Sequence, residues 1–170
     1  MANTFTKIAS VTVGSNAPAS IDFTSIPSAY TDLAIKVSAR KNESGGAVNL
    51  QMLLNDSTSG YTQRALLGDG SSASSFSDNT ELSLMYVTSA ANTANTFNSA
   101  EIYITNYTSS ASKSISVDSV TENNAATTNM SLMAGLWSNS AAINKITLRV
   151  YSPNTLAQYS TFTLYGLSKS

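Results

Sequence analysis

Apolar and polar residues alternate with a period of two along most of this chain, and no other feature constrains its fold as strongly. Residues 31–39 show the alternation most clearly, because the odd positions from Leu33 to Ala39 are apolar while Lys36 and Ser38 are polar. Successive side chains of an extended strand point to opposite faces of a sheet, so this spacing predicts a half-buried β-strand.

The same alternation recurs in further runs. Their apolar positions are Val48, Leu50, Met52 and Leu54; Leu82, Leu84 and Tyr86; Ile102 and Ile104; Ile115 and Val117; Met130, Leu132, Ala134 and Leu136; Ile146, Leu148 and Val150; and Phe162 and Leu164. Residues 5–13 and 20–24 are weaker strand candidates. We expect each of these apolar positions to face the core.

Short turn signals rich in Gly, Asn, Asp and Ser separate the runs, for example Asn55-Asp56-Ser57, Asn123-Asn124 and Ser152-Pro153-Asn154. Such residues tolerate positive φ or bond their own backbone. No segment carries a convincing helical stripe. The pattern therefore predicts an all-β chain, an antiparallel, jelly-roll-like β-sandwich of about 8–10 strands.

The chain shows no change of composition that would divide it, so we expect one domain over residues 1–170. Residues 1–7 are a candidate N-terminal arm because their alternation is weak. Residues 70–78 are rich in Ser and low in complexity, which predicts a long loop or a surface arm. The start of the chain lacks a basic segment followed by an apolar run, so we expect cytoplasmic synthesis without a signal peptide.

Charge is scarce, with charged residues making up 11% of the chain against about 25% in ordinary soluble domains. A surface of hydroxyls and amides suits a protein packed beside copies of itself; a secreted domain with a polar coat is the alternative. The net charge of −1 predicts no nucleic-acid binding, and no apolar run approaches the ~20 residues of a membrane span. Arg40 and Lys41 are interpreted as solvated turn residues.

The chain contains no His and no Cys. Ser–His and Cys–His nucleophiles therefore cannot be built within it, and the commonest metal ligands are missing. We predict no catalytic, cofactor-binding or metal-binding residues, and no enzymatic activity. Residues 55–60 and 69–71 weakly resemble calcium loops but lack the spaced carboxylates of such sites, so ordinary turns are the better interpretation.

Glu101 and Trp137 each have a structural and a functional interpretation. Glu101 sits within a strand on the parity opposite Ile102 and Ile104, which predicts an outward residue or an interface contact. The alternative is one half of a carboxylate pair for glycan cleavage. Trp137, the one tryptophan, is expected to anchor the core or an interface. Its alternative role is a platform on which a sugar stacks.

Four stretches carry a resemblance to a known family. They are Ile21-Asp22-Phe23-Thr24-Ser25-Ile26-Pro27 with Tyr30-Thr31-Asp32-Leu33; Leu53-Leu54-Asn55-Asp56 with Tyr61; Gly135-Leu136-Trp137 with Ala142-Ile143-Asn144-Lys145-Ile146-Thr147-Leu148; and Phe162-Thr163-Leu164-Tyr165-Gly166-Leu167. Their order and spacing resemble small virion structural proteins of tailed bacteriophages, including phages of cyanobacteria. Family members often carry Gly between the Asn and Asp of the second stretch, so the turn at Asn55 is expected to differ.

The resemblance implies a β-sandwich subunit, often trimeric, that is exposed on the virion and has no catalytic residues. Because no fibre-like repeat precedes the domain, we expect a head decoration (cement) protein that binds over junctions of the major capsid protein. Oligomer contacts are expected at Tyr30, Tyr61, Tyr107 and Tyr159. The rival interpretations are a tail-fibre or head-fibre module that recognises a host glycan and, much less favoured, a glycan depolymerase that uses Glu101.

Overall fold

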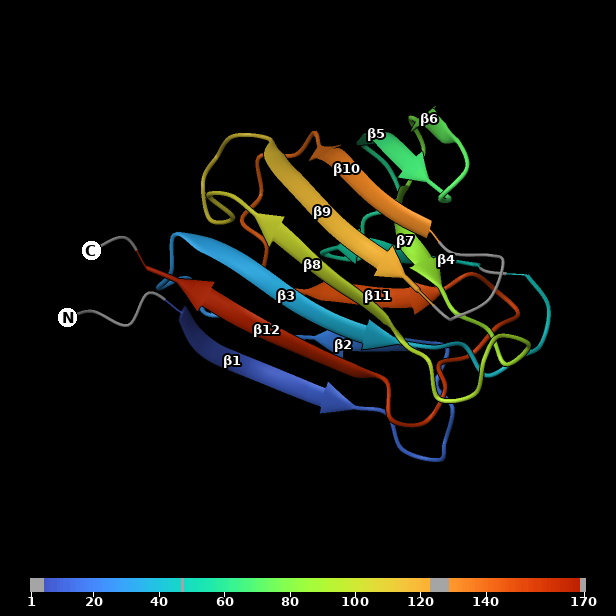
Figure 1. The fold of residues 1–170 in the computed structure, drawn as a ribbon. Helices are drawn as coiled ribbons and strands as arrows, with labels where there is room; N and C mark the ends of the chain where they lie inside the picture. The colour runs from blue at the N-terminus through green and yellow to red at the C-terminus, as the bar shows by residue number, and fades with distance from the viewer. Residues whose placement is uncertain (1–4, 47, 123–128, 169–170) are drawn as a thin grey trace.

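Two antiparallel sheets make up the computed structural model of the chain, which describes residues 5–46, 48–122 and 129–168 (Figure 1). The twelve strands in these ranges are β1 (Phe5–Thr12), β2 (Ser20–Phe23), β3 (Asp32–Ala39), β4 (Val48–Leu54), β5 (Tyr61–Gly68), β6 (Ala73–Asp78), β7 (Leu82–Val87), β8 (Asn98–Ile104), β9 (Lys113–Thr121), β10 (Asn129–Trp137), β11 (Ile146–Val150) and β12 (Thr161–Leu167). None of these residues belongs to a helix with the length and hydropathy of a membrane span.

The strand order is that of an expanded jelly roll. One sheet has the order β2-β11-β4-β7 and the other the order β1-β12-β3-β8-β9-β10-β5-β6. Eight strands, β2-β11-β4-β7 and β3-β10-β5-β6, follow the jelly-roll order, and the antiparallel pair β8–β9 is inserted between β3 and β10. The expected all-β, jelly-roll-like sandwich is therefore confirmed, with more strands than expected.

The core lies between the two sheets and is built from the alternating positions. Leu33 and Ile35 of β3 are fully buried, as are Ile146 and Leu148 of β11. Removing such side chains from water supplies the main driving force for folding, at about 25 cal/mol per Å² of apolar surface. Apart from β10 and Tyr86, the runs identified from the sequence turn their apolar parity toward this core. A register shift in the β4–β7 pairing turns Met85 and Val87 inward instead of Tyr86, which pairs with Asn49.

The expectation that the even positions of β10, from Met130 to Leu136, face the core is wrong. Met130 and Leu132 are 61% and 55% exposed, whereas Met133 and Trp137 on the other parity are 4% and 1% exposed. Position 135 shows why, because a Cβ built on Gly135 would come within 2.9 Å of Leu82 Cδ2 on the opposite sheet. The sheets approach so closely there that only glycine fits, and the large Trp137 fills the space at the end of the strand.

Two further expectations fail at the β5–β6 hairpin and at Arg40-Lys41. Residues 70–78, expected to form a long loop or a surface arm, include β6, which pairs with β5 from Ala73 to Asp78, so the loop expectation is wrong. Arg40 and Lys41 are 8% and 3% exposed rather than solvated. The Arg40 guanidinium donates to the Thr96 carbonyl at 2.8 Å and the Asn92 carbonyl at 3.1 Å, so it orders the connection between β7 and β8. Lys41 Nζ donates to Asn154 Oδ1 at 3.0 Å.

Part of the candidate N-terminal arm belongs to strand β1. Phe5, Thr6 and Lys7 of the candidate arm begin β1, where they pair with Leu167, Gly166 and Tyr165. Residues 1–4 of that candidate arm and the turn signal at Asn123-Asn124 lie outside the described residues.

Tyr30 packs directly on Gly166 of β12, where a Cβ would overlap the tyrosine ring. We expect Gly166→Ala to lower the free energy of unfolding by about 1–3 kcal/mol, because the added methyl must displace a packed ring. Gly46→Ala is the matched control, since a Cβ there meets nothing within 4 Å. Urea denaturation followed by circular dichroism measures both variants, and equal stability of the two would contradict the packing described.

Candidate functional site

The outer face of the larger sheet carries a broad groove over β8, β9, β10, β5 and β6. The groove has a volume of about 950 Å³. We call it the sheet-face groove and define it by Leu66, Leu132 and Ala134 on its floor, Arg64 and Ser75 on the β5–β6 side, and Asp118, Glu101 and Tyr103 on the β9–β8 side. The inserted β8–β9 pair therefore supplies one complete side of it.

The floor of the sheet-face groove and its continuation along the strands are aliphatic and open to solvent. Leu66 is 63% exposed, and the neighbouring Met130 and Val120 are 61% and 43% exposed. The strand register places these side chains together, since Leu132 pairs with Leu66 and Met130 pairs with Val120. A contiguous exposed apolar patch of this kind marks a surface that contacts another molecule.

Charged groups flank the aliphatic floor. Glu101 lies directly between Lys36 of β3 and Asp118 of β9 in the strand register, and its carboxylate forms an ion pair with Lys36 Nζ. Glu101 is thus an outward residue, as its parity predicted. Glu101 and Asp118 stand side by side on adjacent strands.

Tyr103 is the aromatic residue on the β8 side of the sheet-face groove. Its hydroxyl donates to Asp32 Oδ2 at 2.7 Å, and the backbone N–H of Asn106 donates to Asp32 Oδ1 at 2.7 Å. The hydrogen bond to the Asp32 carboxylate raises the pKa of Tyr103 to about 12. These two hydrogen bonds hold the Tyr103 hydroxyl in place at the groove's edge.

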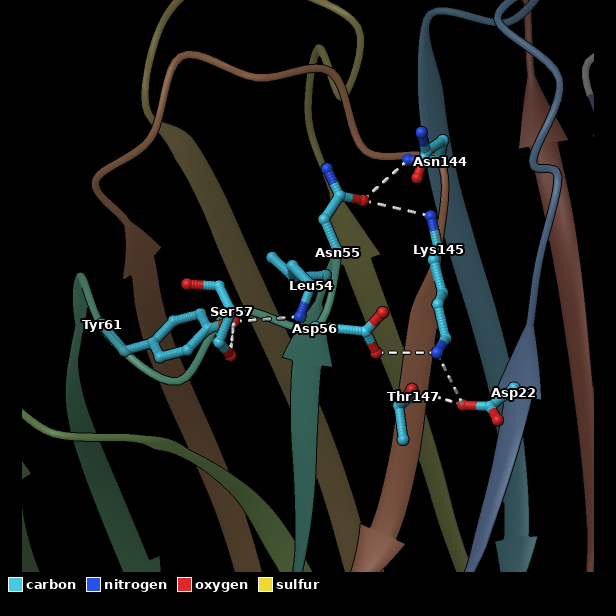
Figure 2. Close-up of polar contacts among 9 residues, drawn as sticks. All are labelled: Asp22, Leu54, Asn55, Asp56, Ser57, Tyr61, Asn144, Lys145 and Thr147. Atoms are coloured by element: carbon cyan, nitrogen blue, oxygen red, sulfur yellow. Dashed lines mark hydrogen bonds and ion pairs between the residues drawn. The ribbon is translucent and has the colours of Figure 1, made fainter.

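A second polar cluster lies at the end of the sandwich, around the turn after β4 (Figure 2). Asn55 Oδ1 accepts hydrogen bonds from the backbone N–H groups of Asn144 at 2.9 Å and Lys145 at 3.1 Å. Asn55 Nδ2 donates to the Ala142 carbonyl at 2.8 Å. We call these residues the turn cluster. Its asparagine amide is engaged by protein groups, so the cluster joins the turn to the strand β11.

The turn itself uses two residues in the left-handed region, with φ of 50° at Asn55 and 59° at Asp56. The backbone N–H of Ser57 donates to the Leu54 carbonyl at 2.9 Å, which closes a tight hairpin-type turn. The Asp56 carboxylate pairs with Lys145 Nζ at 2.7 Å (Figure 2). Among the described residues, no group of three or more Asp or Glu side chains gathers to hold a metal ion.

Tyr61 and Trp137 lie beside the turn cluster and are both 1% exposed. Their rings stack with centroids 6.4 Å apart, and Tyr61 OH accepts from the Leu54 N–H at 2.9 Å. Trp137 is therefore a core anchor, and its burial removes it as a sugar platform. Tyr107 is also fully buried, so the expectation of oligomer contacts at Tyr61 and Tyr107 is wrong.

Three of the four stretches that carry the phage-protein resemblance meet at the turn cluster in structural contacts. Asn55, Tyr61, Trp137 and Lys145 belong to the turn cluster or adjoin it, and the Ile26 N–H donates to the Asn144 carbonyl at 3.0 Å. These residues hold loops and strands together. The sheet-face groove instead uses residues outside those stretches, and the one sequence signal for it was the apolar character of both parities of β10.

Comparison with models of known protein families gives no match, and neither does comparison with curated protein sequences.

Proposed function

We propose that this chain is a virion structural subunit of a tailed bacteriophage, a head decoration protein that binds over junctions of the major capsid protein and stabilises the shell. The observation that carries the proposal is the open aliphatic patch on the larger sheet, formed by Leu66, Leu132, Met130 and Val120. Such a surface gains free energy by being covered by another protein.

Two further observations support a role in contact. The four stretches that resemble phage virion proteins lie in the framework of the sandwich, which is where a shared fold would leave its marks. Charged residues make up only 11% of the chain, so identical subunits crowded on one particle repel each other weakly. Assembly on the virion after synthesis in the host cytoplasm needs no disulfides, and the chain has no Cys.

Electron cryo-microscopy of the purified phage particle tests this proposal directly. We expect density for the sandwich on the outer surface of the head, over contacts between major capsid subunits. Density confined to the tail or to fibres would contradict a decoration role.

A second candidate function is recognition of a host surface glycan by a tail-fibre or head-fibre module. The sheet-face groove favours it, because its concave shape places Tyr103, Arg64 and Asp118 around one opening. The aliphatic floor favours a protein occupant instead, and Trp137 is buried. A glycan array separates the two functions: saturable binding to a host polysaccharide supports the fibre module, and absence of binding supports decoration.

A further inference from the structure

The outward side of β10 is apolar along its whole length. Its outward positions are Met130, Leu132, Ala134 and Leu136, and the first three are exposed. The inward side of the same strand is also buried, through Met133 and Trp137. Large apolar side chains on both sides of a strand are typical of a sheet that is covered on both faces. The single sandwich covers only one of them.

The strand register arranges the outward residues in rows across the sheet. One row runs Asp118, Leu132, Leu66 and Ser75, and the next runs Ser116, Ala134, Arg64 and Ser77. The leucines therefore lie at the centre of the patch. The acid lies on one side of them, and the basic residue lies on the other side, one row further along the strands.

We propose that the occupant of this face is a second copy of the same chain, related by a two-fold axis that runs parallel to the strands between β10 and β5. This operation places β5 of each copy on β10 of the other. Leu66 then contacts the second copy's Leu132, and the same contact repeats across the axis, as an isologous interface requires. The β6 strand of each copy lies over the second copy's β9 and fills its sheet-face groove.

Arg64 and Asp118 are placed so that they can form ion pairs across this two-fold axis. Among the residues that the structure describes, neither Arg64 nor Asp118 forms an ion pair within its own chain. The two-fold operation places the second copy's Asp118 over Ser75, one strand (about 4.8 Å) and two residues (about 6.8 Å) away from Arg64, an offset that the long arginine side chain can span. Both ion pairs form at once, so the face is complementary to itself in charge as well as in apolar surface.

The available area fits a weak interface. In this arrangement β9, β10, β5 and β6 of the two copies overlap, whereas β8 extends past the edge strand β6 of the second copy. Four strands about 4.8 Å apart and about seven residues long, at about 3.4 Å per residue, present roughly 460 Å² on each copy. Two such faces bury about 900 Å² in total, in the size range of weak, transient contacts. Sheets packed face to face in this way form the usual layers of β-sandwich proteins.

This pairing goes beyond the proposed function, because it assigns the aliphatic patch to a second copy of the chain and leaves the contact with the capsid to another face. A two-fold contact also departs from the trimer that the family resemblance implies. Placement on the phage head tests the virion role, whereas the mass of the free protein in solution tests the pairing, so the two can fail separately.

A charge exchange across the axis is the decisive experiment. Analytical ultracentrifugation of the purified wild-type chain should show that a dimer forms as the protein concentration is raised to about 100 µM. Arg64→Asp and Asp118→Arg should each weaken the dimer by about tenfold or more, because like charges then meet. An equimolar mixture of the two variants should restore dimerisation, since each mixed pair regains both ion pairs. Lys7→Asp, on β1 at the opposite edge of the sheet, should leave the dimer unchanged.

Three outcomes would overturn the proposal. One is a wild-type protein that is monomeric throughout the concentration range. A second is a trimer, or a dimer that does not respond to the exchange, because association would then use another surface. The third is a Leu132→Lys variant, folded as judged by circular dichroism, that dimerises as strongly as the wild type; the aliphatic patch would then lie outside the interface.

Discussion

Trp137→Ala should lower the free energy of unfolding by about 3–5 kcal/mol. The indole is 1% exposed and stacks on Tyr61, so its removal leaves a large cavity beside a ring that the stack positions. A domain is typically stable by only about 5–15 kcal/mol, so the loss is a large share of the total. Urea denaturation followed by far-ultraviolet circular dichroism measures it; fluorescence is unsuitable because Trp137 is the one tryptophan.

Trp137→Phe tests how much of this stability comes from ring packing and how much depends on the indole N–H group. The indole Nε1 has no hydrogen-bond partner among the described residues, so phenylalanine removes an unsatisfied donor while keeping most of the stack. We expect a cost below about 2 kcal/mol. Tyr151→Ala, at a position 54% exposed, serves as a surface control and should change stability by less than about 0.5 kcal/mol. A Trp137→Ala variant as stable as this control would contradict the core position of Trp137.

Asn55→Ala should be the second most damaging change, with an expected loss of about 3–4 kcal/mol. It removes the three side-chain hydrogen bonds to residues 142, 144 and 145, each with a net value of about 0.5–1.5 kcal/mol. It also forces alanine into a left-handed backbone at φ 50°, which costs roughly 1–2 kcal/mol in residues without a short polar side chain. Thermal unfolding and urea titration measure the loss.

Asn55→Gly distinguishes these two contributions, because glycine adopts the left-handed backbone freely and lacks only the side-chain bonds. It should recover part of the loss seen with alanine. Asp56→Gly is the matched control on the neighbouring residue, whose carboxylate makes an exposed ion pair of about 0–1 kcal/mol with Lys145. If Asn55→Ala were no worse than Asp56→Gly, the turn cluster would not hold the sandwich together.

The fold class could be predicted because burial imposes a strict period of two on strands with one solvated face. Residues 31–39 and 146–150 show that period in the sequence, and the structure buries the expected side chains. The β5–β6 hairpin could not be found in this way. Its strand β6 is made of Ser, Ala and Asp with a half-buried Phe76, so it lacks the apolar alternation on which the prediction relied.

The period-two rule that identified the core residues did not identify the exposed apolar residues of β10. On β10 the even positions from Met130 to Leu136 are all apolar, whereas the odd positions combine Met133 and Trp137 with Ser131 and Gly135, so the rule assigns the even positions to the interior. The structure assigns Met133 and Trp137 to it instead, because the space opposite Gly135 accepts no side chain. A strand with two apolar sides is itself the signal of a second covered surface, and that signal was present in the sequence.

Buried charges were the other feature that local sequence could not reveal. Lys113 is fully buried, and its Nζ donates to the carbonyls of Ser109 at 2.8 Å and Ala111 at 2.6 Å. Burial lowers its pKa. Arg40 is satisfied in the same manner by carbonyls more than fifty residues away in the chain. Such partners depend on tertiary structure, so a basic residue beside a turn looks solvated until the fold is known.

The central claim is that this sandwich acts by covering other protein surfaces as a component of a phage head. The number of copies per purified particle, measured by mass spectrometry with isotope-labelled peptides of this chain, tests that claim most directly. We predict hundreds of copies, in fixed ratio to the major capsid protein. A few dozen copies or fewer would assign the chain to a tail or fibre and contradict the account.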